Sequence, residues 1–274
     1  MENRDTSPPS YFVPAKKSLG QHFLNSQHVP RWMCDAAELS PGEVVVEIGP
    51  GTGVLTAELL ARGVIVHAIE TDPRSYQLLT ERFSQQLHNK QLYLYQADVR
   101  DGLPKQMPVD SSYKAVANIP YYLSGHILRL LLETASQPSA IVLLMQKEVV
   151  ERITRSRKSS ILSISVEVFG SPKYVRTISP GHFSPPPKVD SAILAITNIG
   201  HHHLPYQETE KFFSLIHAGY GHKRKQLITN LKKDYAHQHL ISTFTKLHIQ
   251  NTARAEDLSV SDWLQLYTEL HNPT

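Results

Sequence analysis

The chain has 274 residues, of which 41% are hydrophobic and 19% charged, a composition typical of globular proteins. This length suits one large domain or one domain with an appendage. No apolar run of about 18 residues predicts a membrane span, so no membrane partner is expected. The single cysteine, Cys34, excludes an intramolecular disulfide and a cysteine-based metal cluster, and no bound metal is expected. Residues 1–15 lack the apolar stretch of a signal peptide, which predicts a flexible, proline-rich lead-in and a cytoplasmic location.

The positive charge of the chain is concentrated in one segment. The formal charge of +3 permits nucleic-acid binding without requiring it, so its distribution matters more than its total. Between residues 211 and 235, six basic residues stand against one acid, Asp234. We interpret Lys223, Arg224 and Lys225 within this segment as RNA-binding residues on a basic helix. A solvated helix face is the alternative.

Apolar runs rich in β-branched residues alternate with helix-like stretches in the first half of the chain. This alternation is typical of a parallel sheet whose strands are joined by crossover helices. Asp72 is expected to cap the second helix and Pro73 to occupy its first turn. The expected strands are 43–48, 63–69, 91–96, 114–117 and 140–145, and the expected helices are 53–62, 72–87 and 125–135.

The pattern changes in the second half of the chain. Residues 161–169, ILSISVEVF, alternate apolar and polar side chains, and residues 189–196 follow a proline-rich corner. Both segments are interpreted as late strands, antiparallel partners at the sheet edge. Strand patterns stop after Thr197, and residues 207–271 have the patterns of several short helices. The expected division is an α/β, Rossmann-like domain over 16–200 and a small all-helical domain over 201–274.

A glycine-rich loop, EIGPGTG, leaves the first expected strand and enters a helix. The Lys–Ser/Thr pair of a P-loop is missing, since Val54 and Leu55 follow the last glycine. The dinucleotide fingerprint is also missing, because Gly49, Gly51 and Gly53 are spaced Gly-x-Gly-x-Gly. A nucleoside-type ligand with an amino-acid tail remains, because glycines let the backbone approach a ligand closely. A plain tight turn is the alternative.

Two acids follow the next two expected strands. Glu70 ends the second strand, where a carboxylate can accept both ribose hydroxyls. Asp98 lies just past the third strand, where it can accept an adenine amino hydrogen. Each acid alone is more often a helix cap or a solvated loop residue. Together with the glycine loop they mark the sheet edge where open α/β sheets bind ligands, and they favour S-adenosylmethionine. The sheet is then that of a class I S-adenosylmethionine-dependent methyltransferase.

The fourth expected strand ends at NIPYY, which brings a further set of polar and aromatic groups to this edge. The Asn118 side-chain oxygen and the Pro120 carbonyl can accept the two hydrogens of an adenine amine and so free its lone pair. Tyr121 can stack on the base. Ile119 and Tyr122 are interpreted as packing support. The alternative for these letters alone is a proline turn with two core tyrosines.

These motifs together resemble the KsgA (RsmA) family of ribosomal RNA adenine dimethyltransferases and, more distantly, the Erm methyltransferases of 23S rRNA. The resemblance covers nearly the whole chain in the family's order. It rests on KKSLGQHFLN (16–25), EIGPGTG, IETD, QAD, NIPYYLS, MQKEVVERI, FSPPPKVDSAIL (183–194), HKRKQLITNL and RAEDLSV (254–260).

The resemblance implies roles for further residues. His22 and Leu24 would contact the cofactor from the N-terminal segment, and Phe183 would pack on the target adenine opposite Tyr121. His22 stands where the family often has Asn, and the stretch 152–166 is shorter than in many members. The residues that would complete the cofactor site are Gly49, Glu70, Asp98 and Asn118.

The family reaction is the transfer of four methyl groups, two to each of two adjacent adenines near the 3′ end of 16S rRNA. The resemblance therefore implies an immature small ribosomal subunit as partner and a role in ribosome biogenesis. We expect a monomer, since no pattern in the sequence indicates a dimer interface. The C-terminal helices would seat it on the RNA. Two alternatives stay open. The first is an Erm-type enzyme acting on a 23S adenine, and the second is a non-catalytic assembly factor of the same fold.

Overall fold

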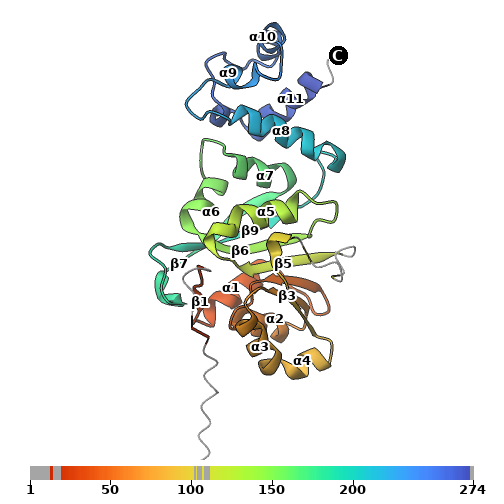
Figure 1. Ribbon diagram of the computed structural model, residues 1–274, viewed down its shortest axis with the longest axis vertical. Coiled ribbons are helices and arrows are strands. Elements are labelled where there is room, and N and C mark those ends of the chain that lie inside the picture. Colours follow the sequence, from red (N-terminus) through yellow and green to blue (C-terminus); the bar gives the residue numbers. More distant parts are fainter. Residues whose placement is uncertain (1–12, 15–19, 102, 104–106, 108–111, 272–274) are drawn as a thin grey trace, which may run out of the picture.

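A mixed β-sheet forms the centre of the computed structural model, which describes residues 13–14, 20–101, 103, 107 and 112–271 (Figure 1). Within these residues the strand order is β4-β3-β2-β5-β6-β9-β7. The first five strands of this order are parallel, and β9 runs antiparallel between β6 and β7. A separate two-stranded ladder joins β1 to β8. The strands are β1 (Phe23–Leu24), β2 (Val44–Ile48), β3 (Ile65–Glu70), β4 (Leu92–Gln96), β5 (Tyr113–Asn118), β6 (Ala140–Gln146), β7 (Ser171–Ile178), β8 (Phe183–Ser184) and β9 (Ser191–Thr197).

Helices cover both faces of the sheet because successive strand residues point to opposite sides. Val45 of β2 belongs to the core shared with α1 to α3, and its neighbour Val46 to the core shared with α5 to α7. The α-helices are α1 (His28–Ala36), α2 (Val54–Ala61), α3 (Pro73–Arg82), α4 (Ser84–His88), α5 (Ser124–Leu132), α6 (Lys147–Thr154), α7 (Ile161–Phe169), α8 (Thr209–Gly219), α9 (Leu227–Leu231), α10 (His237–Lys246) and α11 (Val260–His271). Short 3-10 turns are η2 (Val99–Asp101), η3 (Tyr121–Leu123), η4 (Pro180–His182), η5 (Tyr206–Glu208) and η6 (Ala255–Asp257).

The alternation of strands and helices predicted for the first half is confirmed. The predicted cap of α3 is confirmed as well, since the Asp72 carboxylate accepts the Arg74 backbone N–H and Pro73 occupies the first helical position. The strand β2 lies between β3 and β5, so the chain builds the sheet outward from β2 first on one side and then on the other. A ligand site is expected at the carboxyl ends of the strands at such a switch point.

The prediction of a strand over residues 161–169 is wrong, because these residues form the helix α7. Ser160 caps this helix, and Ser163 bonds back to the Ser160 N–H to complete a capping box. The serines that suggested a solvent-facing side of a strand, Ser163 and Ser165, are buried. The Ser165 hydroxyl donates to the Ile161 carbonyl at 2.9 Å, one turn back in the same helix. The alternation therefore reflects small residues in a helix buried on most sides.

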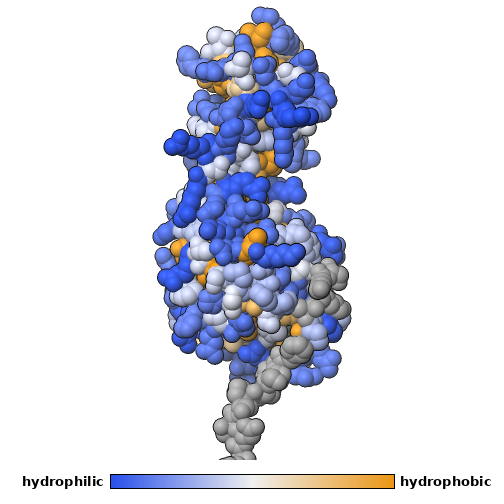
Figure 2. Space-filling view, turned by 90° about the vertical axis from the view of Figure 1, so that its left-hand side faces the viewer, coloured by the Kyte–Doolittle hydropathy of each residue, from blue (hydrophilic) through white to orange (hydrophobic). Residues whose placement is uncertain are grey.

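The C-terminal helices α8 to α11 gather beyond α5, α6 and α7, at the end of the molecule farthest from α4 (Figure 1). Phe212 and Trp263 of these helices belong to the same hydrophobic core cluster as Phe169 of α7. The face seen in Figure 2 is mostly hydrophilic, with small separate hydrophobic spots. A division into domains at residue 200 stays a prediction.

The expected lead-in over residues 1–15 lies outside the described residues except for two positions. Val13 is buried, and the Pro14 carbonyl accepts a hydrogen bond from the Arg74 guanidinium at 3.1 Å. These two residues are therefore attached to the start of α3. Across the described ranges, no helix has the length and apolarity needed to cross a membrane.

Candidate active site

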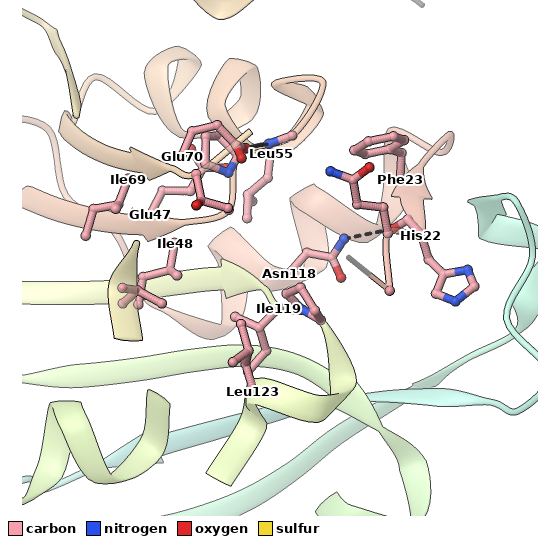
Figure 3. Close-up of a pocket in the computed structure, with 18 of the residues that line it drawn as sticks. His22, Phe23, Glu47, Ile48, Leu55, Ile69, Glu70, Asn118, Ile119 and Leu123 are labelled. Carbon is pink, nitrogen blue, oxygen red and sulfur yellow. Dashed lines mark hydrogen bonds between the residues drawn. The ribbon is translucent and has the colours of Figure 1, made fainter. Parts of the chain in front are cut away.

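A pocket opens at the carboxyl ends of β2, β3 and β5, at the switch point of the sheet (Figure 3). Every residue predicted for the cofactor and for the chemistry lines it, although these residues come from segments far apart in the chain. The predicted residues brought together here are His22, Leu24, Gly49, Gly51, Glu70, Asp98, Asn118, Pro120, Tyr121 and Phe183.

The glycine loop forms one wall of the pocket. Gly49, Gly51 and Gly53 have φ angles of +70°, +59° and +79°, a region that other residues adopt only with strain. A Cβ at Gly51 would lie 2.9 Å from the Phe23 ring. A Cβ at Gly53 would lie 2.6 Å from the Phe83 ring. The loop therefore needs glycines both for its backbone path and for the aromatic rings that rest on it.

A buried carboxylate that the sequence analysis did not single out lies beneath this loop. Glu47 of β2 accepts a 2.7 Å hydrogen bond from the Thr56 hydroxyl through Oε2, while its Oε1 is buried without a partner. Burial, with a smaller contribution from nearby Glu70, raises the pKa of Glu47 to about 8. A buried carboxylate oxygen without a donor is costly unless a ligand supplies one. The acid inside the apolar run VVVEI was the available signal.

Glu70 connects the glycine loop to the next loop of the sheet edge. One carboxylate oxygen accepts the Gly51 N–H at 3.0 Å and the other accepts the Asp72 N–H at 2.8 Å. Figure 3 shows the first of these bonds beside Leu55. Burial raises the pKa of Glu70, while the two backbone donors oppose the shift. Glu70 therefore holds the wall of the pocket, and each of its oxygens keeps a further lone pair with which to accept.

Asp98 carries an ion pair that the sequence did not indicate. Its carboxylate accepts the Arg100 backbone N–H at 2.9 Å and pairs with the Arg100 guanidinium at 2.5 Å. Hydrogen bonds from that side chain hold the pKa of Asp98 below its usual value. Asp98 is thus an ionised acceptor, and Arg100 is a further member of the lining.

Asn118 ends β5 with its side chain in a defined orientation. Its amide nitrogen donates to the His22 backbone carbonyl at 3.3 Å, so Oδ1 is the end of the amide left free to accept (Figure 3). The Pro120 carbonyl accepts the Leu123 N–H at 3.0 Å and has one more lone pair. The predicted packing role of Ile119 is confirmed, since its side chain is buried.

The N-terminal segment closes the pocket by pairing with the proline-rich corner. In the ladder of β1 and β8, Leu24 lies opposite Phe183. The His22 ring points away from Glu47 and Glu70, and its Nδ1 donates to the Pro185 carbonyl at 2.8 Å (Figure 3). The His22 ring is thus bonded to Pro185, and only the His22 backbone lies beside Asn118. The predicted contact of His22 with a cofactor is therefore left to its backbone.

Two aromatic rings stand at the outer part of the lining. The Tyr121 ring is stacked on the His22 ring with 5.9 Å between centroids, and its hydroxyl bonds the Ser191 hydroxyl at 2.7 Å. Phe183 is 3% exposed and lines the same pocket. Tyr121 is therefore fixed at both its ring face and its hydroxyl.

Two predictions about position are wrong. Tyr122 is 59% exposed rather than packed in the interior, although it lines the rim of the pocket. Lys223, Arg224 and Lys225 lie in an exposed turn between α8 and α9 rather than on a helix. Their place at the C-terminal end of the molecule keeps them outside the pocket. Within the described residues, no group of three or more His, Cys, Asp or Glu side chains is arranged to hold a metal ion.

The fold and the pocket together define a Rossmann-like methyltransferase. The dimethyladenosine transferase from Plasmodium falciparum has a TM-score of 0.73 to this structure at 24% identity, covering 89% of this chain and 96% of that chain. The 23S rRNA methyltransferase ErmE has a TM-score of 0.70 at 24% identity, covering 90% of this chain and 99% of that chain. At this level of identity the similarity establishes the shared fold.

The sequence comparisons are more specific. The model of the ribosomal RNA adenine dimethylase family matches residues 13–272. The ribosomal RNA small subunit methyltransferase A of Dehalococcoides mccartyi strain CBDB1 is 36% identical over 263 residues, covering 94% of this chain and 89% of that protein. The chain belongs to the ribosomal RNA adenine dimethylase family. The resemblance inferred from its motifs is thereby confirmed.

Proposed function

We propose that the protein transfers methyl groups from S-adenosylmethionine to the N6 amines of two adjacent adenosines near the 3′ end of 16S rRNA, within immature small ribosomal subunits. The observation that carries the proposal is the pocket that joins the glycine loop and Glu70 to Asn118 and Tyr121. The small-subunit substrate follows the name of the relatives that are 36% identical to this chain. We place the reaction in the cytoplasm and assign it to a monomer.

The lining fits this cofactor in two respects. The unpartnered Oε1 of Glu47 is a buried acceptor for a cationic or N–H group. The glycine loop lines the pocket with backbone at Gly49 and Gly51, which lets a ligand approach the main chain closely. We assign the amino-acid end to Glu47 and the loop, the ribose hydroxyls to Glu70, and the adenine amine to Asp98. When bound, the cofactor supplies an electrophilic methyl group on a sulfonium.

Asn118 and Pro120 perform the central step on the target base. An exocyclic adenine amine is a poor nucleophile because its lone pair is delocalised into the ring. Asn118 Oδ1 and the second lone pair of the Pro120 carbonyl accept its two hydrogens and favour a tetrahedral nitrogen. Both acceptors are held in place before the base arrives, since the Asn118 amide donates to the His22 carbonyl and the Pro120 carbonyl accepts the Leu123 N–H. The amine proton leaves to solvent after the nitrogen has been alkylated, so no strong base is needed.

Tyr121 and Phe183 hold the base in the plane that this step requires. Tyr121 is fixed by Ser191 and by the His22 ring, and Phe183 is fixed by the ladder with Leu24. Rigid rings on two elements restrict the base to orientations in which its amine meets Asn118. The exposed turn with Lys223, Arg224 and Lys225 lies farther out, where its positive charge can contact RNA phosphates.

The test is methylation of immature small subunits by the purified protein with labelled cofactor, followed by mapping of the modified bases. We expect four methyl groups on two adjacent adenines near the 3′ end of 16S rRNA. Exclusive modification of a 23S rRNA fragment would establish the Erm-type alternative instead. Cofactor binding without methylation of either RNA would indicate a non-catalytic assembly factor.

A further inference from the structure

An exposed aromatic ring stands immediately outside the pocket. Tyr122 follows Tyr121 in the turn η3, and while Tyr121 is partly buried, Tyr122 is 59% exposed. What sets this ring apart from the other exposed tyrosines is its position, because it lines the rim of the pocket. The chemistry described above uses Asn118, Pro120 and Tyr121, and it leaves Tyr122 without a role.

The Tyr122 ring is supported on one side by backbone. A Cβ at Gly20 would lie 3.3 Å from the ring carbon Cε1, so the Gly20 backbone lies against the ring. Gly20 has a φ of +57°, and it therefore combines this contact with a turn that favours glycine. A ring held against backbone loses less freedom when it binds a ligand than a free side chain does.

A cation accompanies this ring at the rim. The Arg100 side chain is 61% exposed while its guanidinium is held by Asp98. Arg100 lines the same pocket as Tyr122, Arg100 from η2 and Tyr122 from η3. An aromatic face beside a positioned guanidinium is the combination that stacks a nucleobase and contacts the phosphate next to it.

The substrate of the proposed function requires such a site. A base that enters the pocket leaves its stack, and its neighbour in the chain then loses one stacking partner. We propose that Tyr122 is a second base-binding site, on which the base next to the target adenine stacks while the target occupies the pocket, with Arg100 at the connecting phosphate. This inference rests on the proposed function.

The test compares Tyr122→Leu, which keeps bulk without a π face, with Tyr122→Phe, which keeps the face. The control is Tyr206→Leu, since Tyr206 is 45% exposed but lies in η5, outside the pocket. Base–aromatic stacking predicts a rise of about 5- to 100-fold in the KM for immature small subunits with Tyr122→Leu. We expect Tyr122→Phe and Tyr206→Leu to stay within about twofold of wild type.

A readout specific to stacking separates this role from a structural one. Replacing the neighbouring adenine by uridine, which stacks weakly, should raise the KM of the wild type for immature small subunits. The same replacement should leave the KM of Tyr122→Leu unchanged. The Kd for the cofactor should be the same in all variants. The inference would be overturned if Tyr122→Leu had the KM of the wild type. It would also be overturned if the uridine substitution raised the KM of the wild type and of Tyr122→Leu by the same factor. In that case the wild type still methylates the subunit, whereas failure of the proposed function would leave the wild type itself inactive on it.

Discussion

The side-chain amide of Asn118 donates to the main-chain carbonyl of His22, 3.3 Å away and 96 positions earlier in the chain. This bond decides which end of the amide faces the pocket, because the carbonyl can only accept and the amide nitrogen is the end that donates. The His22 ring is in turn bonded to the Pro185 carbonyl. The orientation of the central acceptor thus depends on two segments that lie outside the parallel part of the sheet.

Asn118→Ala should lower the rate of methyl transfer about 100-fold or more, since removing one preorganised polar group at a reacting centre has effects of this size. Asn118 is only partly buried at a strand end, so the melting temperature should change little. The measurement is single-turnover methylation of immature small subunits, with calorimetric titration of the cofactor. Asn89→Ala, at the exposed end of α4, is the matched control. Comparable activity in the two variants would refute the acceptor role.

Gly51→Ala should abolish cofactor binding while leaving a folded protein. The new Cβ would lie 2.9 Å from the Phe23 ring, and the φ of +59° costs an alanine about 1–2 kcal/mol. The Phe23 ring must then shift toward the pocket or away from the loop. Gly181→Ala is the matched control, because a Cβ at Gly181 would meet nothing within 4 Å. Titration of both variants with the cofactor checks this, and equal affinities would contradict the proposed role of the loop.

Much of this fold could be predicted from periodicity, and α7 shows where periodicity failed. The parallel strands are buried on both faces, so they appear as continuous apolar runs. In α7 the buried Ser163 and Ser165 imitate the polar side of a strand. Only tertiary contacts, from α5 on one side and α11 on another, decide that both faces of this segment are covered.

The candidate site was predictable where it depends on strand ends. Glu70 and Asn118 end strands of one parallel sheet, so their meeting at the same edge follows from topology alone. The bond from His22 to Pro185 joins segments 163 positions apart, and no local pattern predicts it. The exposure of Tyr122 likewise depends on the turn η3, which aims two successive aromatic side chains in different directions.

Glu47→Gln should change how the stability of the protein depends on pH. Burial raises the pKa of Glu47 from 4.5 to about 8, so the folded state retains a proton that the unfolded state has lost between these values. The contribution of Glu47 to the free energy of unfolding is therefore fully present below pH 4.5. It is lost as the pH rises to about 8, at about 1.4 kcal/mol per pH unit. The glutamine stays neutral and avoids this decline.

Denaturant unfolding at pH 5 and pH 8 measures this difference. The variant should gain on the wild type by a few kcal/mol between the two values, on the order expected for a raised carboxyl pKa. Glu81→Gln, on the exposed side of α3, should follow the wild type. Parallel pH profiles for Glu47→Gln and wild type would show that Glu47 is ionised in the folded protein.

Reversing the charges of Lys223, Arg224 and Lys225 should weaken RNA binding and flatten its salt dependence. The three residues are exposed in the turn between α8 and α9. Each phosphate contact contributes about 0.7–0.9 to the slope of log K against log salt, so the triple Glu variant should lose about two in slope. Binding to immature small subunits at several salt concentrations measures this.

Lys90→Glu is the control for this last variant, because Lys90 is exposed between α4 and β4, at the opposite end of the molecule (Figure 1). It changes the total charge without changing the basic turn, so its slope should match the wild type. Methylation by the triple variant at low salt should approach that of the wild type, since the pocket itself is unchanged. An unaltered slope in the triple variant would mean that these side chains are solvated in the complex and that other residues contact the RNA phosphates.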